Sequence, residues 1–326
     1  MDCSSHLLLT GGTGFFGRSL LRTWLDQCSA GAPCPTVTIL TREPGAFFAR
    51  YPEFAGQPWL GAHAGDITDK QTLPHKTKFT HILHAAADST LGARLTPLQR
   101  YDQIVSGTRN LLDLAVECDA QRFLLTSSGA VYGPQPPEID CITEDSHRIP
   151  DPLDPENTYG IAKRAAEHLC ALYGQNYGLH TVITRGFAFV GPDLPLDAHF
   201  AIGNFIRDAL WRDEISVAGD GTALRSYLDQ RDLATWLITM LDRGLPGRAY
   251  NVGSDQAVSI AELANIVRDL LAPGKPVLIR GNSQKSGGRN RYIPSIQRAR
   301  DELGLSIRIP LRLAILATAD ALTRNG

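Results

Sequence analysis

Short, almost continuous apolar runs alternate with longer helical patterns over the first 190 residues. The apolar runs predict strands at 7–10, 37–40, 81–84, 123–126 and 181–184, and the patterns between them predict helices at 15–27, 98–118 and 157–177. Apolar strands that alternate with helices are typical of a parallel sheet covered on both faces. Because connections between parallel strands are right-handed, we expect an α/β fold with a doubly wound Rossmann sheet.

The pattern changes after Arg185. A helix is expected at 202–211 and a strand at 249–253. Ser259 and Glu262 fit a capping box at the start of a further helix that extends to residue 271. The polar, Gly-rich stretch 283–290 is typical of a mobile loop.

A glycine-rich turn follows the first predicted strand directly. Its sequence is Thr-Gly-Gly-Thr-Gly-Phe-Phe-Gly over residues 10–17, and a helical pattern comes next. In this spacing the first glycine permits a tight turn, the second lets the backbone approach a diphosphate, and the third allows close packing of helix and strand. The diphosphate would lie at the helix N-terminus, where the dipole favours an anion. The expected cofactor-binding residues are Gly11, Thr13, Gly14, Phe15, Phe16 and Gly17.

The end of the second predicted strand indicates which nicotinamide cofactor binds. An acidic residue there binds the ribose 2′-hydroxyl of NAD, whereas a nearby arginine accommodates the 2′-phosphate of NADP. Here Thr41 and Arg42 end the strand, and the first carboxylate is Glu43. This arrangement favours NADP, with NAD as the alternative. Asp66 and Ile67, which follow the next apolar segment, are expected beside the adenine.

Tyr159 and Lys163 are four residues apart in a helical pattern, which places them on one helix face. A phenol with its ordinary pKa of roughly 10 is a poor acid or base at neutral pH. A neighbouring ammonium group stabilises the phenolate and lowers that pKa. We therefore expect Tyr159 to be the catalytic acid or base, and Lys163 to tune it and to hold the cofactor ribose.

Ser128 belongs to a Ser-Ser-Gly-Ala-Val-Tyr-Gly segment that begins at Ser127 and follows a predicted strand. Open parallel sheets bind their ligands at the carboxyl ends of the strands. The Ser128 hydroxyl can there hydrogen-bond the oxygen whose carbon exchanges hydride. Together with the glycine turn, the serine, tyrosine and lysine predict an oxidoreductase.

Composition and charge exclude other classes of function. The 326 residues are 43% hydrophobic, which is sufficient for a large buried core. The formal net charge of −2 gives no reason to expect a nucleic-acid partner. No apolar run approaches the roughly 18–20 residues of a membrane span, and the N-terminus lacks an export signal. We expect a cytoplasmic protein without a membrane partner.

The six cysteines show no metal-ligand spacing, so no metal site is expected. Their even number is compatible with three disulfides. In a chain of this length without an export signal, reduced and buried thiols are favoured.

The motifs together resemble the extended short-chain dehydrogenase/reductase family, the NAD-dependent epimerase/dehydratases that act on nucleotide-linked sugars. The resemblance extends from about residue 6 to residue 300. Besides the motifs above it includes His84-Ala85-Ala86-Ala87 and Tyr250-Asn251-Val252-Gly253. It implies that Ala85, Ala86 and Ala87 contact the cofactor.

The resemblance implies two domains and a homodimer. The Rossmann domain would comprise 1–185 and 229–257, and a smaller C-terminal nucleotide-sugar domain would comprise 186–228 and 258–326. Two long helices, those predicted at 98–118 and 157–177, would form the dimer interface.

Several substrate-binding residues also follow from the resemblance. Arg225, in a Leu-Arg-Ser-Tyr segment, resembles the family arginine that binds the substrate diphosphate, a role that suits the planar guanidinium. Arg289 or Arg291 would be a second such arginine. His199 or Asn204 would contact the sugar or the base.

Departures from the family pattern narrow the chemistry. Family 4,6-dehydratases carry Thr-Asp-Glu where this chain has Ser128-Gly129-Ala130. Glycine and alanine have no carboxyl group for the proton transfers of dehydration, so that reaction is disfavoured. Two asparagines common in the family are replaced by Ile104 and Ala188, so the sugar pocket differs from that of the best-known epimerases.

Two reactions remain. A reductase consumes a hydride in every turnover and suits NADPH, whereas a 4-epimerase returns the hydride to its substrate and usually retains NAD. Arg42 favours NADPH-dependent reduction of a 4-keto sugar, often a 6-deoxy sugar in this family, carried on a nucleoside diphosphate. The alternative is an NAD-dependent 4-epimerase. A non-catalytic dinucleotide-binding protein is less compatible with the intact serine, tyrosine and lysine.

Overall fold

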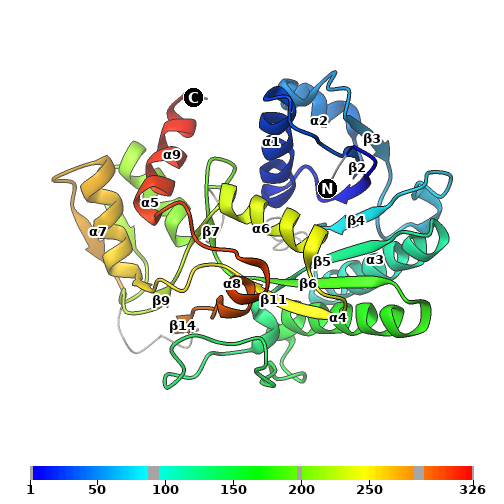
Figure 1. Cartoon of the computed structure of the whole chain (residues 1–326). Helices are drawn as coiled ribbons and strands as arrows, with labels where there is room; N and C mark the ends of the chain where they lie inside the picture. The colour runs from blue at the N-terminus through cyan, green and yellow to red at the C-terminus, as the bar shows by residue number, and fades with distance from the viewer. Residues whose placement is uncertain (1–2, 87–94, 197–199, 282–289, 325–326) are drawn as a thin grey trace. The chain divides into compact units, whose positions relative to one another are not determined.

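The chain divides into two compact units in the computed structural model (Figure 1). The structure describes residues 3–86, 95–196, 200–281 and 290–324. The first unit comprises residues 1–133, 149–185 and 234–250, and the second comprises 134–148, 186–233 and 251–326.

A seven-stranded sheet forms the centre of the first unit, in the order β11-β6-β5-β4-β1-β2-β3. Neighbouring strands from β3 to β5 pair in parallel. The strand order reverses at β1, which lies between β2 and β4, as in a doubly wound sheet. The strands are β1 (His6–Thr10), β2 (Thr36–Thr41), β3 (Leu60–Ala64), β4 (His81–His84), β5 (Arg122–Ser128), β6 (His180–Gly186) and β11 (Arg248–Val252).

Helices cover both faces of this sheet. Figure 1 shows α1 and α2 on one side, and α3 and α4 packed side by side on the other. The core between α3, α4 and the sheet includes Ile82, Leu111, Phe123 and Ala162, all buried. The helices are α1 (Phe15–Ser29), α2 (Pro44–Arg50), α3 (Pro97–Glu117), α4 (Thr158–Tyr177) and α6 (Gln230–Arg243), which starts in the second unit, with 3₁₀ turns η1 (Pro52–Phe54), η2 (Lys70–Thr72), η4 (Gly129–Tyr132) and η5 (Pro155–Asn157).

The second unit is built from small sheets and four helices among its described residues. Two of the sheets are strand pairs, β10-β7 and β13-β8, and the third has three strands in the order β12-β9-β14. The strands are β7 (Phe189–Val190), β8 (Ile215–Val217), β9 (Leu224–Arg225), β10 (Leu228–Asp229), β12 (Val258–Ser259), β13 (Val277–Ile279) and β14 (Arg291–Tyr292). The helices are α5 (Ala201–Trp211), α7 (Ile260–Leu271), α8 (Gln297–Leu303) and α9 (Leu311–Arg324).

The predicted α/β class and doubly wound sheet are confirmed. The expected helices correspond to α1, α3, α4, α5 and α7 with ends shifted by at most two residues, and Ser259 and Glu262 do form the capping box of α7. The sequence prediction missed β3, whose burial does not follow a continuous apolar pattern, and the amphipathic helix α6. Most of the predicted loop at 283–290 lies outside the described residues.

The boundaries of the two units differ from the expected domain boundaries mainly at residues 134–148. This segment belongs to the second unit because its backbone and side chains form hydrogen bonds with residues more than 100 positions away. The Gln135 Oε1 atom accepts a hydrogen bond from the Ile293 amide (2.8 Å), and the Ile142 amide donates to the Ile293 carbonyl (2.9 Å). The Asn251 side-chain amide donates to the carbonyls of Ile142 (2.9 Å) and Ser295 (3.1 Å).

The expectation of reduced cysteines is wrong for one pair. Cys28 and Cys34 form a disulfide, because the chain turns back after α1 and brings their Cα atoms to 6.0 Å. Cys118 and Cys170 are free and buried, whereas Cys3 is exposed and Cys141 is half-buried. No helix in the described part of the chain is long and apolar enough to cross a bilayer.

Candidate active site

Neighbouring parallel strands carry most of the predicted cofactor residues of the first unit to one edge of the sheet. In the register of the sheet, Thr10 is opposite both Leu40 and His84, and His84 is opposite Leu125. The glycine turn after β1, the residues after β2 and β4, and the end of β5 therefore lie at the same edge. Ligands of open α/β sheets bind at this carboxyl edge.

The glycine turn is packed so closely that two of its positions exclude a side chain. Gly11 has a φ of +71°, and a Cβ atom there would lie 2.5 Å from the carbonyl of Ala85. A Cβ atom on Gly17 would lie 2.3 Å from the Gly11 carbonyl oxygen. Gly14 is exposed and is the N-cap of α1 without a side-chain cap, so the N-terminus of the helix stays accessible. This cradle fits the diphosphate of a nicotinamide dinucleotide.

A chain of hydrogen bonds connects the start of the glycine turn to helix α3. The Ala86 amide donates to Thr10 Oγ1 (3.2 Å), and the Thr10 hydroxyl donates to His84 Nδ1 (2.8 Å). The Thr108 hydroxyl gives its hydrogen to the Ile104 carbonyl (2.7 Å), so it accepts from His84 Nε2 (3.2 Å). These roles assign a neutral His84 with its proton on Nε2. The imidazole therefore links the cofactor edge to helix α3.

The other predicted cofactor residues lie around this edge. Arg42 is exposed directly after β2. Asp66 is half-buried, and its carboxylate accepts hydrogen bonds from the amide (2.9 Å) and hydroxyl (2.8 Å) of Thr68. Ile67 is buried and packs against Gly107 of α3. Ala87 lies outside the described residues.

Tyr159 and Lys163 come from the first two turns of α4. The Lys163 Nζ atom lies 5.9 Å from the centre of the half-buried Tyr159 ring and donates a hydrogen bond to the Thr126 carbonyl (2.8 Å). Only 2% of Lys163 is exposed, and burial lowers its pKa to about 8, although Glu167 acts in the opposite direction. Tyr159 thus faces a buried amine that is fixed by the adjacent strand.

Ser128 is the last residue of β5 and the N-cap of the 3₁₀ turn η4. Its side-chain oxygen accepts a hydrogen bond from the Ala130 amide (3.2 Å). Gly160 lets this turn approach α4, because a Cβ atom there would lie 2.6 Å from the Ala130 carbonyl oxygen. The absence of a side chain next to Tyr159 therefore brings the Ser128 turn against the helix that carries Tyr159 and Lys163.

Two of the predicted substrate residues lie on adjacent strands of the second unit. Arg225 is on β9 and Arg291 on β14, where Tyr292 is opposite Arg225. An Arg225 guanidinium nitrogen donates to the Leu224 carbonyl (2.8 Å), and Arg291 forms an ion pair with Asp140.

Of the remaining substrate candidates, the structure describes only Asn204. Asn204 is half-buried on α5. His199 and Arg289 lie outside the described residues. Of the two asparagine replacements, Ile104 is buried on α3 in the first unit, and Ala188 is half-buried in the second.

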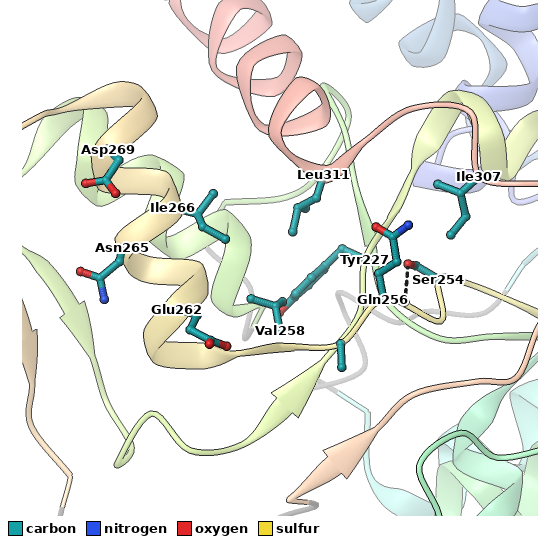
Figure 2. Close-up of a pocket in the computed structure, with 11 residues that line it drawn as sticks. Tyr227, Ser254, Gln256, Val258, Glu262, Asn265, Ile266, Asp269, Ile307 and Leu311 are labelled. Atoms are coloured by element: carbon teal, nitrogen blue, oxygen red, sulfur yellow. Dashed lines mark hydrogen bonds between the residues drawn. The ribbon is translucent and has the colours of Figure 1, made fainter.

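A separate pocket of about 520 Å³ lies in the second unit. Figure 2 shows Val258, Ile266 and Leu311 among the side chains that line it, together with Glu262 and Asp269 of α7. None of the described residues that line it is an arginine or lysine. Two carboxylates without a cationic side chain do not suit a diphosphate, so this pocket does not match the predicted substrate site.

Comparison with known proteins identifies the family. The model of the "NAD dependent epimerase/dehydratase family" matches residues 7–253. The chain belongs to this family. The resemblance expected from its motifs is therefore confirmed.

Relatives and solved structures with named activities are similar to this chain. The chain is 27% identical over 310 residues to UDP-glucuronic acid decarboxylase 2 of Arabidopsis thaliana, a match that covers 94% of this chain and 66% of the decarboxylase. The fold is similar to that of a UDP-glucose 4-epimerase from Thermotoga maritima, with a TM-score of 0.83, 19% identity and coverage of 98% of this chain and 99% of that one. A UDP-glucuronic acid 4-epimerase from Bacillus cereus, in complex with UDP-glucuronic acid and NAD, gives a TM-score of 0.81, 22% identity and coverage of 98% and 100%.

Sequence reasoning missed two buried groups that support the site. In the sequence, His84 is distinguished only as part of the His-Ala-Ala-Ala motif, and Glu167 belongs to none of the predicted motifs. Glu167 follows Lys163 by four residues, as Lys163 follows Tyr159, so its position on the same helix face could have been inferred. Its partners are Ser127 of β5 and Arg185 of β6, and a single sequence does not reveal that these strands meet the helix there.

Substituting Gly17 tests the closeness of the glycine turn. We expect Gly17→Ala to lower the free energy of unfolding by about 1–3 kcal/mol, because the added methyl group overpacks the turn. Gly14→Ala is the matched control, since its Cβ atom would have 3.4 Å to the nearest atom. It should keep wild-type stability in thermal denaturation but bind NAD more weakly. Equal stability losses in both variants would contradict this account.

The neutral state of His84 makes stability depend on pH. Burial lowers the pKa of His84 in the folded protein to about 3, whereas the same imidazole has its ordinary pKa of 6.5 in the unfolded chain. Below about pH 6.5 the unfolded state therefore binds a proton that the folded state refuses, and stability falls by up to about 1.4 kcal/mol per pH unit. His84→Gln should be less stable at pH 7 but lose this slope in urea denaturation between pH 7 and 5. An unchanged slope would show that His84 is not the neutral group described.

Proposed function

We propose that this chain is an NAD-dependent enzyme that transiently oxidises C4 of a nucleoside-diphosphate sugar and returns the hydride, a 4-epimerase. One observation carries the proposal: Tyr159 and Lys163 lie on α4 against the Ser128 turn, in the same unit as the glycine cradle. Family membership supports NAD, and relatives named for UDP-glucuronic acid support a UDP-linked hexose or hexuronate as substrate.

The side chains divide the proton chemistry among them. When bound, NAD supplies the hydride acceptor. Tyr159 removes the proton from the 4-hydroxyl oxygen of the sugar and later returns it to the same oxygen. The Ser128 hydroxyl hydrogen-bonds that oxygen, and the Lys163 ammonium stabilises the Tyr159 phenolate.

The Ser128 turn argues against elimination chemistry. Gly129 and Ala130 occupy η4, and neither has a carboxyl group to protonate a leaving hydroxyl. Decarboxylation needs no such acid, because oxidation at C4 of a uronate places a ketone β to its carboxylate. Loss of CO₂ from UDP-glucuronate is therefore the competing outcome to measure.

A specific observation favours a second candidate, the NADPH-dependent reduction of a 4-keto sugar. Arg42 is exposed after β2, where a carboxylate would favour NAD, and could receive a 2′-phosphate. The relatives described above are a decarboxylase and two 4-epimerases, and the family is named for NAD. The reductase is accordingly the second choice, although it uses the same three residues.

The cofactor and the product distinguish these reactions. We expect freshly purified protein to release NAD on denaturation, and to interconvert 4-epimers of UDP-glucose or UDP-glucuronate in NMR without added cofactor. Formation of UDP-xylose and CO₂ from UDP-glucuronate would show that the enzyme is a decarboxylase and not an epimerase. Net oxidation of added NADPH by a 4-keto sugar, with no retained NAD, would overturn the epimerase and favour the reductase.

Tyr159 has to move the proton in either reaction. We expect Tyr159→Phe to lower kcat by at least about 10²-fold, the usual scale of general acid–base catalysis, while the protein still binds NAD. Tyr177→Phe is the matched control, because this tyrosine lies on the same helix and is 60% exposed. Wild-type turnover in Tyr159→Phe would refute the assigned role.

Other expectations stay predictions. Exposed apolar side chains on α3 and α4, among them Leu98 and Leu172, support the homodimer through these helices.

The two arginines on β9 and β14 are proposed to bind the substrate diphosphate. The Cys28–Cys34 disulfide is atypical of the cytoplasmic location that the sequence favours.

A further inference from the structure

A buried ion pair that the reaction does not use lies behind the Ser128 turn. Arg185 of β6 donates to both carboxylate oxygens of Glu167, the shortest contact being 2.7 Å. Glu167 is 8% exposed. Its Oε1 atom also accepts a hydrogen bond from the Ser127 hydroxyl (2.6 Å), and Arg185 donates to the Tyr132 hydroxyl (2.9 Å) and lies 4.9 Å from the centre of the Tyr132 ring.

These contacts fix the turn at both of its ends. Ser127 directly precedes Ser128, and Tyr132 is the last residue of η4. Between them, Arg164 of α4 donates to the Val131 carbonyl (3.2 Å). A turn tied at both ends and in the middle has few alternative conformations, which is how a catalytic hydroxyl is held in place.

The same carboxylate also acts on Lys163, one helical turn earlier. Its negative charge raises the pKa of Lys163 against the larger effect of burial. Among the described residues, Tyr159, Cys170 and His84 are further titratable groups that interact with the amine. Burial keeps His84 neutral and raises the pKa of the Cys170 thiol, so neither supplies charge at neutral pH. Glu167 is therefore the anion that favours the ammonium form.

We propose that Glu167, held by Arg185, is a positioning residue that fixes the Ser128 turn through Ser127 and keeps Lys163 protonated. The inference rests on the proposed roles of Ser128, Tyr159 and Lys163. Burying a carboxylate is costly unless it is paired. Here the pairing with Arg185 allows one carboxylate to act on both the Ser128 turn and Lys163 without touching the substrate.

Glu167→Gln tests the electrostatic part. It removes the anion but keeps a side chain that can accept from Ser127. We expect kcat to fall on the order of 10-fold or more, with KM within about threefold, because the sugar-binding contacts remain. The high-pH limb of the kcat profile, where Lys163 loses its proton, should move to lower pH. A limb that stays in place would overturn this part of the inference.

Ser127→Ala tests the positioning part and is the variant that keeps the buried pair. We expect a several-fold loss of kcat, no movement of the high-pH limb, and faster amide hydrogen exchange in the peptide that covers residues 127–132. The exchange measurement needs neither substrate nor bound cofactor. Wild-type kcat together with wild-type exchange would overturn the positioning role.

Asp208→Asn is the matched control. Asp208 is 5% exposed and paired with Arg207 (2.8 Å) in the second unit, so its loss also disturbs a buried acid. This variant should lose stability without moving the pH limb or the exchange of residues 127–132. An equal limb shift in Asp208→Asn would assign the effect to general destabilisation and overturn the inference. Activity that survives in Tyr159→Phe would instead remove the proposed function itself.

Discussion

The buried amine of Lys163 is the constraint on which the rest of the candidate site depends. A charged group removed from water is costly unless protein groups replace its hydration. The Thr126 carbonyl accepts one of its hydrogens, and Glu167 supplies a countercharge one turn away. Glu167 lies on α4 itself, but the Thr126 carbonyl belongs to β5, so the amine keeps this hydrogen bond only if α4 lies close against β5. The need to satisfy this amine therefore fixes the helix that carries Tyr159 relative to the strand that carries Ser128.

Small residues make that approach possible. Gly160 gives space to the Ala130 carbonyl, so the Ser128 turn reaches the first turn of α4. The absence of a side chain acts the same way at the cofactor edge, where Gly11 and Gly17 bring β1, the segment after β4, and α1 together. Close backbone packing thus positions the groups proposed to bind the cofactor and those proposed to react with the sugar.

Buried polar groups next to the carboxyl edge of the sheet stabilise this packing. The neutral His84 connects Thr10 to Thr108, and Glu167 connects Ser127 to Arg185. Each group is satisfied by partners from different elements, as buried polar groups must be. Such networks hold their members in one arrangement, which suits a site where a proton moves between fixed oxygen atoms.

The sequence by itself determined the parts of this protein that depend on neighbours along the chain. Apolar periodicity predicted the sheet and its long helices, the glycine spacing predicted the turn, and four-residue spacing placed Tyr159 and Lys163 on one face. Chain-local patterns did not reveal the pairing of Glu167 with Arg185 or the hydrogen bond between Gln135 and Ile293. The structure decided these because each contact needs two separate segments to meet, and a single sequence records the residues of both segments but not their meeting.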